Sequence, residues 1–295
     1  MDDEEFSQLL EGFVQQKCLN LLYYKENILG PLSLEAMRPI IMKRFPNHLR
    51  SLKLVKLNTS GVFVNKLLDM IVDHSASINA LSLVQLRLST VNVEKILEFL
   101  DATSTLEELD LSWNNFRPTD FLSMSEHFSK NVVIRVLNLS WNLMIPSNLQ
   151  KDRSEMQYPI EKVKFFNRDI WEMDHAELMA HRFSELIRKN QQLQHLDLAN
   201  TGLSEVFLFN MLPALRRAKS LIAFHVGSNP GITERLQDYY QDKLRVAEQP
   251  PHNAISIGKE KNAYKTALDD PEAYQNLSGT MINLLKMKAQ MMQQV

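Results

Sequence analysis

The sequence contains one pattern twice, and this repetition limits the possible folds more than any other feature. Residues 106–116 read LEELDLSWNNF and residues 134–144 read IRVLNLSWNLM, so each position recurs 28 residues later. A fixed period of this length indicates an array of stacked units. Successive copies of the central pair of apolar residues lie 29, 28, 28, 59 and 28 residues apart, and these pairs are Leu52/Leu54, Leu81/Leu83, Leu109/Leu111, Leu137/Leu139, Leu196/Leu198 and Phe224/Val226.

Each unit is expected to be a short strand followed by a helix. In residues 108–112 the alternation places Leu109 and Leu111 on one face of a strand, while Glu108, Asp110 and Ser112 lie on the other. Segments between the strands, such as 93–100 and 176–187, have apolar residues at helical spacing. A helical crossover returns the chain to the same end of the sheet, so the strands should be parallel.

The pattern LxxLxLxxNxL at 28–29-residue spacing resembles the leucine-rich repeat, specifically the long ribonuclease-inhibitor type, over about residues 16–260. The resemblance implies an α/β solenoid with the shape of a horseshoe, with parallel inner strands, outer helices and a cap at each end. Strands are packed more closely than helices, which also favours this curvature. The asparagine of the pattern is replaced in four copies, by Leu57, Leu86, Arg168 and Thr201.

Weaker copies suggest how the chain is divided. Leu19/Leu21 and Ile255/Ile257 read as degenerate end repeats, and Ile160, Val163, Phe165 and Ile170 read as an irregular copy within the 59-residue interval. We therefore predict an N-terminal helical cap with a degenerate first repeat in 1–48, repeats in 49–260 with an irregular one at about 144–192, and a C-terminal tail in 261–295.

Three asparagines are expected to support the fold. Asn114, Asn142 and Asn229 follow their strands directly, where a buried turn leaves backbone donors and acceptors without strand partners. A carboxamide can satisfy both kinds of group at once.

Two tryptophans mark a candidate binding surface. Trp113 and Trp141 occupy equivalent positions in adjacent repeats, so their rings should stack about one strand spacing apart. Such a pair can anchor a protein interface. It can equally be a packing element that covers the neighbouring turn, and the sequence leaves both readings open.

Charged residues at outward strand positions extend this candidate surface. An alternating charge pattern around an aromatic pair suits protein docking, although stripes of this kind are also common on solvated surfaces. His195 and His225 belong to adjacent repeats and are displaced by two positions along the strand, so they could approach each other. The predicted partner-binding residues are Trp113, Trp141, Glu108, Asp110, Lys53, Asp197, His195 and His225.

The segment 281–292 of the tail is rich in methionine and weakly amphipathic. Methionine side chains adapt to imperfect packing and suit adaptable docking surfaces. This segment either folds back over the end of the solenoid or serves as an arm that docks on a partner.

Composition excludes several classes of function. Lys+Arg 33 against Asp+Glu 35 gives no field that would attract nucleic acid. The acidic opening MDDEE does not fit a secretory signal, no apolar run is long enough to span a bilayer, and the single Cys18 fits a reducing compartment. Motifs for phosphate loops, metal sites and activated serines are lacking, and we predict no enzyme activity, no cofactor and no metal.

These observations predict a non-catalytic cytoplasmic scaffold that binds other proteins through its concave face and C-terminal arm, as a subunit of a hetero-complex. An alternative is a regulator of a small GTPase, because GTPase-activating proteins of the nuclear-transport GTPase use a similar solenoid. Those regulators carry a strongly acidic tail, which this chain lacks. The sequence LDLSWN also resembles repeats of ciliary axoneme proteins, which suggests a location in the cilium.

Overall fold

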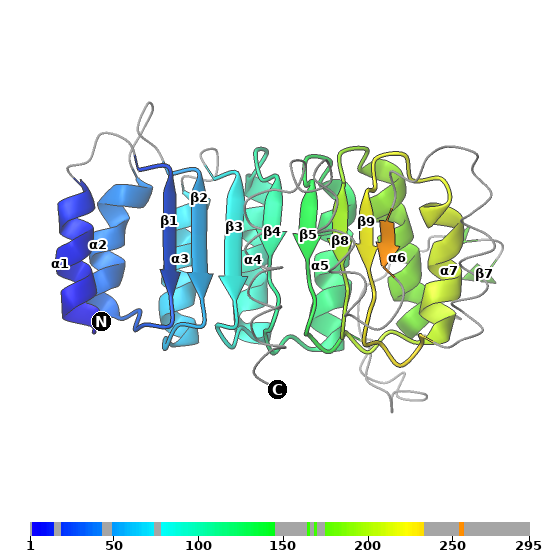
Figure 1. The fold of residues 1–295 in the computed structure, drawn as a ribbon, viewed down its shortest axis with the longest axis horizontal. Helices are drawn as coiled ribbons and strands as arrows, with labels where there is room; N and C mark the ends of the chain where they lie inside the picture. The colour runs from blue at the N-terminus through cyan, green and yellow to red at the C-terminus, as the bar shows by residue number, and fades with distance from the viewer. Residues whose placement is uncertain are drawn as a thin grey trace.

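The chain forms an α/β fold built on one parallel sheet. The computed structural model describes residues 2–14, 19–42, 49–73, 78–144, 164–165, 168–169, 175–232 and 254–256. Eight strands follow one another across the sheet in chain order (Figure 1). They are β1 (Leu21–Lys25), β2 (Ser51–Val55), β3 (Ala80–Val84), β4 (Glu108–Asp110), β5 (Val136–Asn138), β8 (His195–Asp197), β9 (Ala223–His225) and β10 (Ala254–Ser256).

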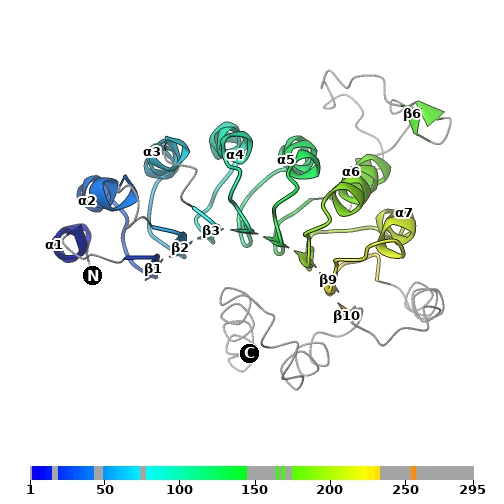
Figure 2. The same ribbon diagram turned by 90° about the horizontal axis from the view of Figure 1, so that it is seen from above.

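The helices form a single layer on one side of this sheet. Figure 2 shows the strands along the inner side of a gently curved array and the helices along its outer side. The helices are α1 (Asp3–Val14), α2 (Pro31–Ile41), α3 (Gly61–Val72), α4 (Thr90–Ala102), α5 (Pro118–Lys130), α6 (His175–Lys189) and α7 (Glu205–Leu215). The opposite side of the sheet, which carries no described helix, is called the concave face below.

The repeated leucines lie side by side because the strands pair in register. Leu52 pairs with Leu81, and the series continues through Leu109, Leu137, Leu196 and Phe224. All of these side chains are buried between the sheet and the helices. The helices add large aromatic side chains to this core, namely Phe99, Phe121, Phe128, Phe183 and Phe207. Burial of each such side chain contributes roughly 1.5–3 kcal/mol.

The backbone turns in the same way after β1 to β5, β8 and β9. One residue per repeat adopts a left-handed conformation two positions after the second core residue. The residues at this position are Glu26, Lys56, Gln85, Trp113, Trp141, Asn200 and Ser228, with φ between 52° and 60°. This turn directs the chain away from the sheet toward the next helix.

The buried asparagines complete these turns, as the sequence predicted. Asn114 Oδ1 accepts hydrogen bonds from the N–H groups of Leu86 and Leu88, both at 3.1 Å. Its Nδ2 donates to the carbonyl oxygens of Leu83 at 2.7 Å and Leu111 at 2.9 Å. Each carboxamide therefore joins two adjacent repeats, because its partners belong to both.

Asn229 makes the same contacts one repeat from the C-terminal end of the array. Its Oδ1 accepts from the N–H groups of Thr201 and Leu203, and its Nδ2 donates to Leu198 and Val226 carbonyls. Thr201, which replaces asparagine, keeps only the local part of the pattern by donating from Oγ1 to Leu198 O at 2.7 Å.

The inward pair of the first strand lies three positions after the predicted pair. Leu22 and Tyr24 pair with Leu52 and Leu54 and face the core, whereas the predicted pair was Leu19/Leu21. Leu21 lies on the concave face and is 50% exposed. Side chains alternate between the two faces of a strand, so a shift by an odd number of residues reverses the face of every side chain. Tyr24 is fixed on the core side by stacking on Phe6 of α1, with 3.5 Å between ring centroids.

The described residues of the 59-residue interval contribute no strand to the parallel sheet. β5 pairs directly with β8, so that Val136 lies beside His195. Two short strands within the interval, β6 (Lys164–Phe165) and β7 (Arg168–Asp169), pair with each other and are antiparallel. The expectation that residues 160–170 form a repeat copy in the array was therefore wrong, and the described contribution of this interval to the array is helix α6.

At the C-terminal end of the sheet, Ile255 of the predicted degenerate repeat lies in β10 and pairs with Phe224. Helix α2 lies within the region 1–48 that was predicted as an N-terminal cap and degenerate first repeat. The predicted C-terminal tail at 261–295, with its methionine-rich segment, lies outside the described residues.

Candidate protein-binding face

The concave face carries a continuous row of in-register side chains, here called the central row. Each strand contributes its middle outward position, and neighbouring members pair directly across the sheet. The row consists of Tyr23, Lys53, Ser82, Asp110, Asn138, Asp197 and His225. Glu108 and His195 lie two positions earlier on β4 and β8, on the same face.

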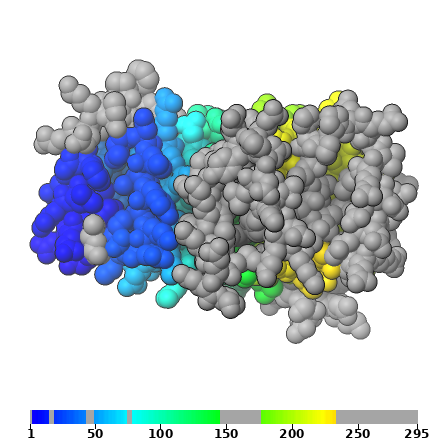
Figure 3. All heavy atoms as spheres, viewed as in Figure 1, coloured from blue at the N-terminus to red at the C-terminus, as the bar shows by residue number. Residues whose placement is uncertain are grey.

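At its N-terminal end this face is open. Atoms of the N-terminal strands and helices, in shades of blue, are visible there in the space-filling view (Figure 3). Leu21 and Tyr23 of β1 are 50% and 46% exposed.

The middle of the central row is held in place by local hydrogen bonds. Asp110 Oδ1 accepts from the Ser112 N–H at 2.9 Å, and Asp197 Oδ1 accepts from the Ala199 N–H at 2.9 Å. Asn138 Oδ1 accepts from the Ser140 N–H at 3.1 Å. Each bond uses one side-chain oxygen to close the turn after the strand.

Asp110 is an unusual carboxylate because it is only 3% exposed. Burial, the largest cause, and the negative charge of Asp197 together raise the pKa of Asp110 to about 6. Polar groups of Ser112 and Asn138 oppose this shift. Neither reaches Oδ2 with the geometry of a hydrogen bond, and Oδ2 has no partner within the described chain.

His195 is equally buried, at 3% exposure, and is neutral at physiological pH. Burial lowers the pKa of His195 to about 4, and the positive charges of His225 and Arg135 contribute. Both ring nitrogens are buried without a hydrogen-bond partner among the residues that the structure describes. The predicted offset of two positions between His195 and His225 is confirmed, because Asp197 and not His195 pairs with His225.

Lys53 is electrostatically coupled to the acidic side chains. Burial lowers the pKa of Lys53, and the charges of Glu108 and Asp110 oppose that shift. The face therefore has a cation on β2 and three carboxylates on β4 and β8, as the charge pattern of the sequence indicated.

The predicted stacking of the tryptophans is confirmed. The rings of Trp113 and Trp141 lie 4.1 Å apart between centroids, with 7° between their planes. Both residues have a left-handed backbone, with φ of 60° and 59°, and both are half-buried. The Trp141 Nε1 is buried and has no acceptor in the described ranges. Each tryptophan lies just beyond its strand, three residues after Asp110 of β4 or Asn138 of β5.

Six of the eight predicted residues, Lys53, Glu108, Asp110, His195, Asp197 and His225, lie at outward positions of the sheet, whereas Trp113 and Trp141 lie in the turns after β4 and β5, so the eight do not form a single cluster. Lys53 is separated from Asp110 by the strand β3. Sequence reasoning did not include Asn138, which lies between Asp110 and Asp197 in the central row. The alignment of LDLSWN with LNLSWN contains the necessary signal, because Asn138 and Asp110 occupy the same position of the pattern.

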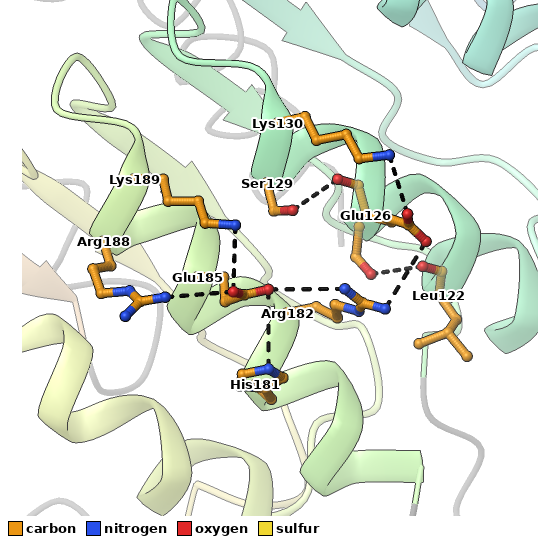
Figure 4. Close-up of polar contacts among 10 residues, drawn as sticks. Leu122, Glu126, Ser129, Lys130, His181, Arg182, Glu185, Arg188 and Lys189 are labelled. Carbon is orange, nitrogen blue, oxygen red and sulfur yellow. Dashed lines mark hydrogen bonds and ion pairs between the residues drawn. The ribbon is translucent and has the colours of Figure 1, made fainter. Parts of the chain in front are cut away.

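The helical side has a charge cluster of a different kind. Glu185 on α6 lies near four basic side chains of its own helix (Figure 4), with distances of 3.9 Å to His181, 3.8 Å to Arg182, 3.4 Å to Arg188 and 3.3 Å to Lys189. Arg182 also approaches Glu126 of α5 at 3.9 Å. The contact of Arg182 with Glu126 connects α6 to α5, whereas the contacts of Glu185 lie within α6, and both are structural roles.

No group of three or more histidine, cysteine, aspartate or glutamate side chains in the described ranges could hold a metal ion. No helix of the described chain is both long and apolar enough to cross a bilayer.

No protein-family model matches the chain. A search of curated proteins also found no match.

Proposed function

We propose that this chain is a leucine-rich-repeat solenoid of the ribonuclease-inhibitor type, a horseshoe whose concave face binds another protein without catalysing a reaction. The proposal is supported by the in-register leucines, the asparagine contacts between repeats and the single helical layer. The sheet leaves one face without a described helix, and that face gathers polar and aromatic side chains.

The stacked tryptophans are the observation that carries the proposal. A left-handed backbone costs a non-glycine residue about 1–2 kcal/mol. Asn200, a residue that tolerates this conformation well, occupies the same position in another repeat. The chain instead places two large aromatic rings there, in adjacent repeats and in contact with each other. Rings of this kind offer a large contact area at little cost in rotamer entropy, which suits an interface.

A scaffold fits the polar residues of this face better than an enzyme does. Asp110, Asn138 and Asp197 each use one oxygen to close a turn, so these side chains are engaged in the fold. His195 is neutral and has no carboxylate to orient it among its described contacts. A general base normally needs such an orienting partner.

We further propose that the protein acts as an intracellular subunit of a hetero-complex. The sequence of its repeats favours a complex of the ciliary axoneme. The test of location is immunofluorescence of the tagged chain in ciliated cells. Signal that excludes the axoneme would remove this part of the proposal and leave the binding role intact.

The binding role is tested by affinity capture with mass spectrometry from cells that express the full chain. The variant Trp113→Ala with Trp141→Ala should lose the specific partner and keep the thermal midpoint and the circular dichroism spectrum of a folded protein. Val62 and Val91 are 64% and 69% exposed at the start of two helices, so Val62→Ala with Val91→Ala is the matched control and should retain the partner. An unchanged partner set in the tryptophan variant contradicts the proposal.

A further inference from the structure

The concave face changes from exposed to buried along the array. At the outward positions of β1, Leu21 and Tyr23 are 50% and 46% exposed. On the central strands the corresponding positions are almost closed to solvent, with 3% exposure for Ser82 on β3, 1% for Asn138 on β5 and 7% for Asp197 on β8. Outward side chains of a sheet face without a second layer are normally solvated, as they are on β1. The middle of the face is therefore covered.

A second set of buried apolar side chains indicates the same. Outward positions of β2, β3, β5 and β9 carry apolar side chains that are only 4–9% exposed. They are Val55, Ala80, Val84, Val136 and Ala223. None of these five belongs to the apolar core between the sheet and the helices. The described helices all lie on the other side of the sheet (Figure 2), so the contacts that bury this set come from elsewhere in the chain.

The position of each stretch in the chain limits what the cover can be. The longer stretches outside the described residues are 145–163, 233–253 and 257–295. The first leads to β6, which Figure 2 shows on the helical side. The second joins β9 to β10, and a connection between neighbouring parallel strands crosses on the side of the helices. Neither constraint applies to residues 257–295, here called the C-terminal segment, which follow β10.

The C-terminal segment is long enough to reach the whole covered area. β10 lies five strand spacings from β3, which is about 24 Å at ~4.8 Å for each spacing. An extended chain advances about 3.3 Å per residue, so roughly eight residues cover that distance. Most of the C-terminal segment is therefore available for contacts with the face.

The composition of the C-terminal segment matches the face that it would cover. The face has three carboxylates on β4 and β8, whereas residues 277–295 contain Lys286 and Lys288 and no aspartate or glutamate. The methionine and leucine side chains around these lysines adapt to an irregular apolar surface. The segment can thus supply apolar contacts to the buried valines and alanines and positive charge to the carboxylates.

We propose that the C-terminal segment lies across the concave face of its own chain, from β9 to β3, and that a partner binds the middle of this face only after the segment leaves it. The first half of this inference is independent of the proposed function, and the second half rests on it. A segment tethered at β10 has an effective concentration of about 1 mM or more at the face, so modest contacts keep the face closed. A partner must therefore bind the face more tightly than the segment does.

The first test measures the accessibility of a thiol in the full chain, in a Cys18→Ser background. Ser82→Cys places the thiol at a 3% exposed position of β3, and Tyr23→Cys is the control at a 46% exposed position of β1. The thiol of Ser82→Cys should react with a soluble disulfide reagent at least about 100-fold more slowly than that of Tyr23→Cys.

Removal of the apolar contacts of the segment should then open the face. Leu284→Asp with Leu285→Asp should speed the labelling of Ser82→Cys about 100-fold, the factor expected when two leucines lose their burial, and should leave that of Tyr23→Cys unchanged. The thermal midpoint of the circular dichroism signal should stay that of a folded protein. Slow labelling of Ser82→Cys in the double leucine variant overturns the inference.

Charge reversal provides a second variant with a matched control. Lys286→Glu with Lys288→Glu should speed the labelling of Ser82→Cys about 10-fold. Lys66 on α3 and Lys219 after α7 are exposed, so Lys66→Glu with Lys219→Glu makes the same change in net charge and should have no effect. Equal labelling rates in the two charge variants contradict the contact with the carboxylates.

A cross-link in the wild-type chain tests the contact without a substitution. A carbodiimide should join Lys286 or Lys288 to Glu108 or Asp197, and mass spectrometry identifies the linked peptides. In a mixture of ¹⁵N-labelled and unlabelled protein, these links should join peptides of the same isotopic form. Links between the two forms would show that a second copy covers the face and would overturn the inference, as would the absence of any link from these lysines to the face.

Affinity capture separates the inference from the proposed function. The double leucine variant should capture more partner than the wild type, because its face is open. Unchanged capture together with fast labelling of Ser82→Cys overturns the claim that the segment controls partner binding. Normal capture by Trp113→Ala with Trp141→Ala contradicts the proposed function, whereas the thiol and cross-linking results still decide whether the C-terminal segment covers the face.

Discussion

Asn142 Oδ1 accepts a hydrogen bond from the backbone N–H of Asn114 at 3.0 Å. The two residues are 28 positions apart and occupy the same place in adjacent repeats. Each repeat thus completes the turn of its predecessor, and the loss of one carboxamide should affect both.

Asn114→Ala should therefore destabilise the protein strongly. The substitution leaves the N–H groups of Leu86 and Leu88 and the carbonyl of Leu83 without their partner inside a dry turn. We expect the free energy of unfolding to fall by about 2–4 kcal/mol, measured by urea denaturation. Asn115 is exposed and serves as the control. Asn115→Ala should change the free energy of unfolding by less than about 0.5 kcal/mol. Equal effects of the two variants would contradict a bridging role for Asn114.

The register of β1 predicts opposite results for two adjacent leucines. Leu22 is 5% exposed and pairs with Leu52, whereas Leu21 is 50% exposed. Leu22→Asp buries a charge in the core and should lower the unfolding free energy by about 3 kcal/mol or more. Leu21→Asp should be close to neutral. Thermal melts of both variants measure this, and a reversal would mean that Leu19 and Leu21 form the inward pair.

Asp110 should lower stability as pH rises. Its folded-state pKa of about 6 exceeds the ordinary value of 3.8, so the folded protein binds more protons between these two pH values. The stability that this group contributes is present at low pH and is lost as pH rises to about 6. Asp110→Asn removes the charge and keeps an acceptor for the Ser112 N–H. We expect it to stabilise the protein at pH 7 by ~1–3 kcal/mol, measured by urea denaturation. A lower stability at pH 7 would show that the charge of Asp110 is favourable.

His195 has the opposite dependence. Its folded-state pKa of about 4 is below the ordinary 6.5, so the unfolded chain binds the extra proton and stability rises from pH 4 to pH 6.5. The two residues therefore offset each other in the wild type. In His195→Gln the contribution of His195 is removed and that of Asp110 remains. The free energy of unfolding of this variant should therefore fall as pH rises from 4 to 6. In Asp110→Asn only the contribution of His195 remains, so the free energy of unfolding should rise as pH rises from 4 to 6.5. Urea denaturation of the wild type and the two variants at several pH values measures how the free energy of unfolding changes with pH. The same pH dependence in all three proteins would contradict opposing contributions of Asp110 and His195.

Glu185 should contribute to the attachment of α6. Its side chain is only 16% exposed and lies near four basic groups, in contrast to Glu98, which is 52% exposed beside Lys95. Glu185→Gln should cost about 1 kcal/mol at low salt, and the loss should shrink at high salt. Glu98→Gln should cost less. Chemical denaturation at two ionic strengths distinguishes the pair, and a salt-independent loss would point to packing as the cause.

The sequence was most informative where side-chain type and period agree. The leucine pairs from Leu52 to Phe224, the asparagine turns and the tryptophan stack were all predictable, because each depends on a position that recurs at the repeat interval. The outward charges could be placed on one face for the same reason.

The prediction failed where this agreement is weak. Residues 19–24 read LNLLYY, an apolar run with too little alternation to reveal its inward side, and the stacking of Tyr24 on Phe6 selects it. Residues 160–170 have apolar spacing of the right kind, but β5 and β8 pair directly. The burial of Asp110 and His195 could not be foreseen either, since an outward strand position is normally solvated.

The direct pairing of β5 with β8 has a practical consequence. The chain leaves the sheet after Asn138 and returns at His195, yet the N–H groups of Gln194 and His195 bond to Arg135 O as if the two strands were consecutive. Spacers of very different length could join these strands without altering the ladder. The register of the sheet at this point is therefore set by β5 and β8 themselves, so a change in the number of residues between them should leave their pairing intact.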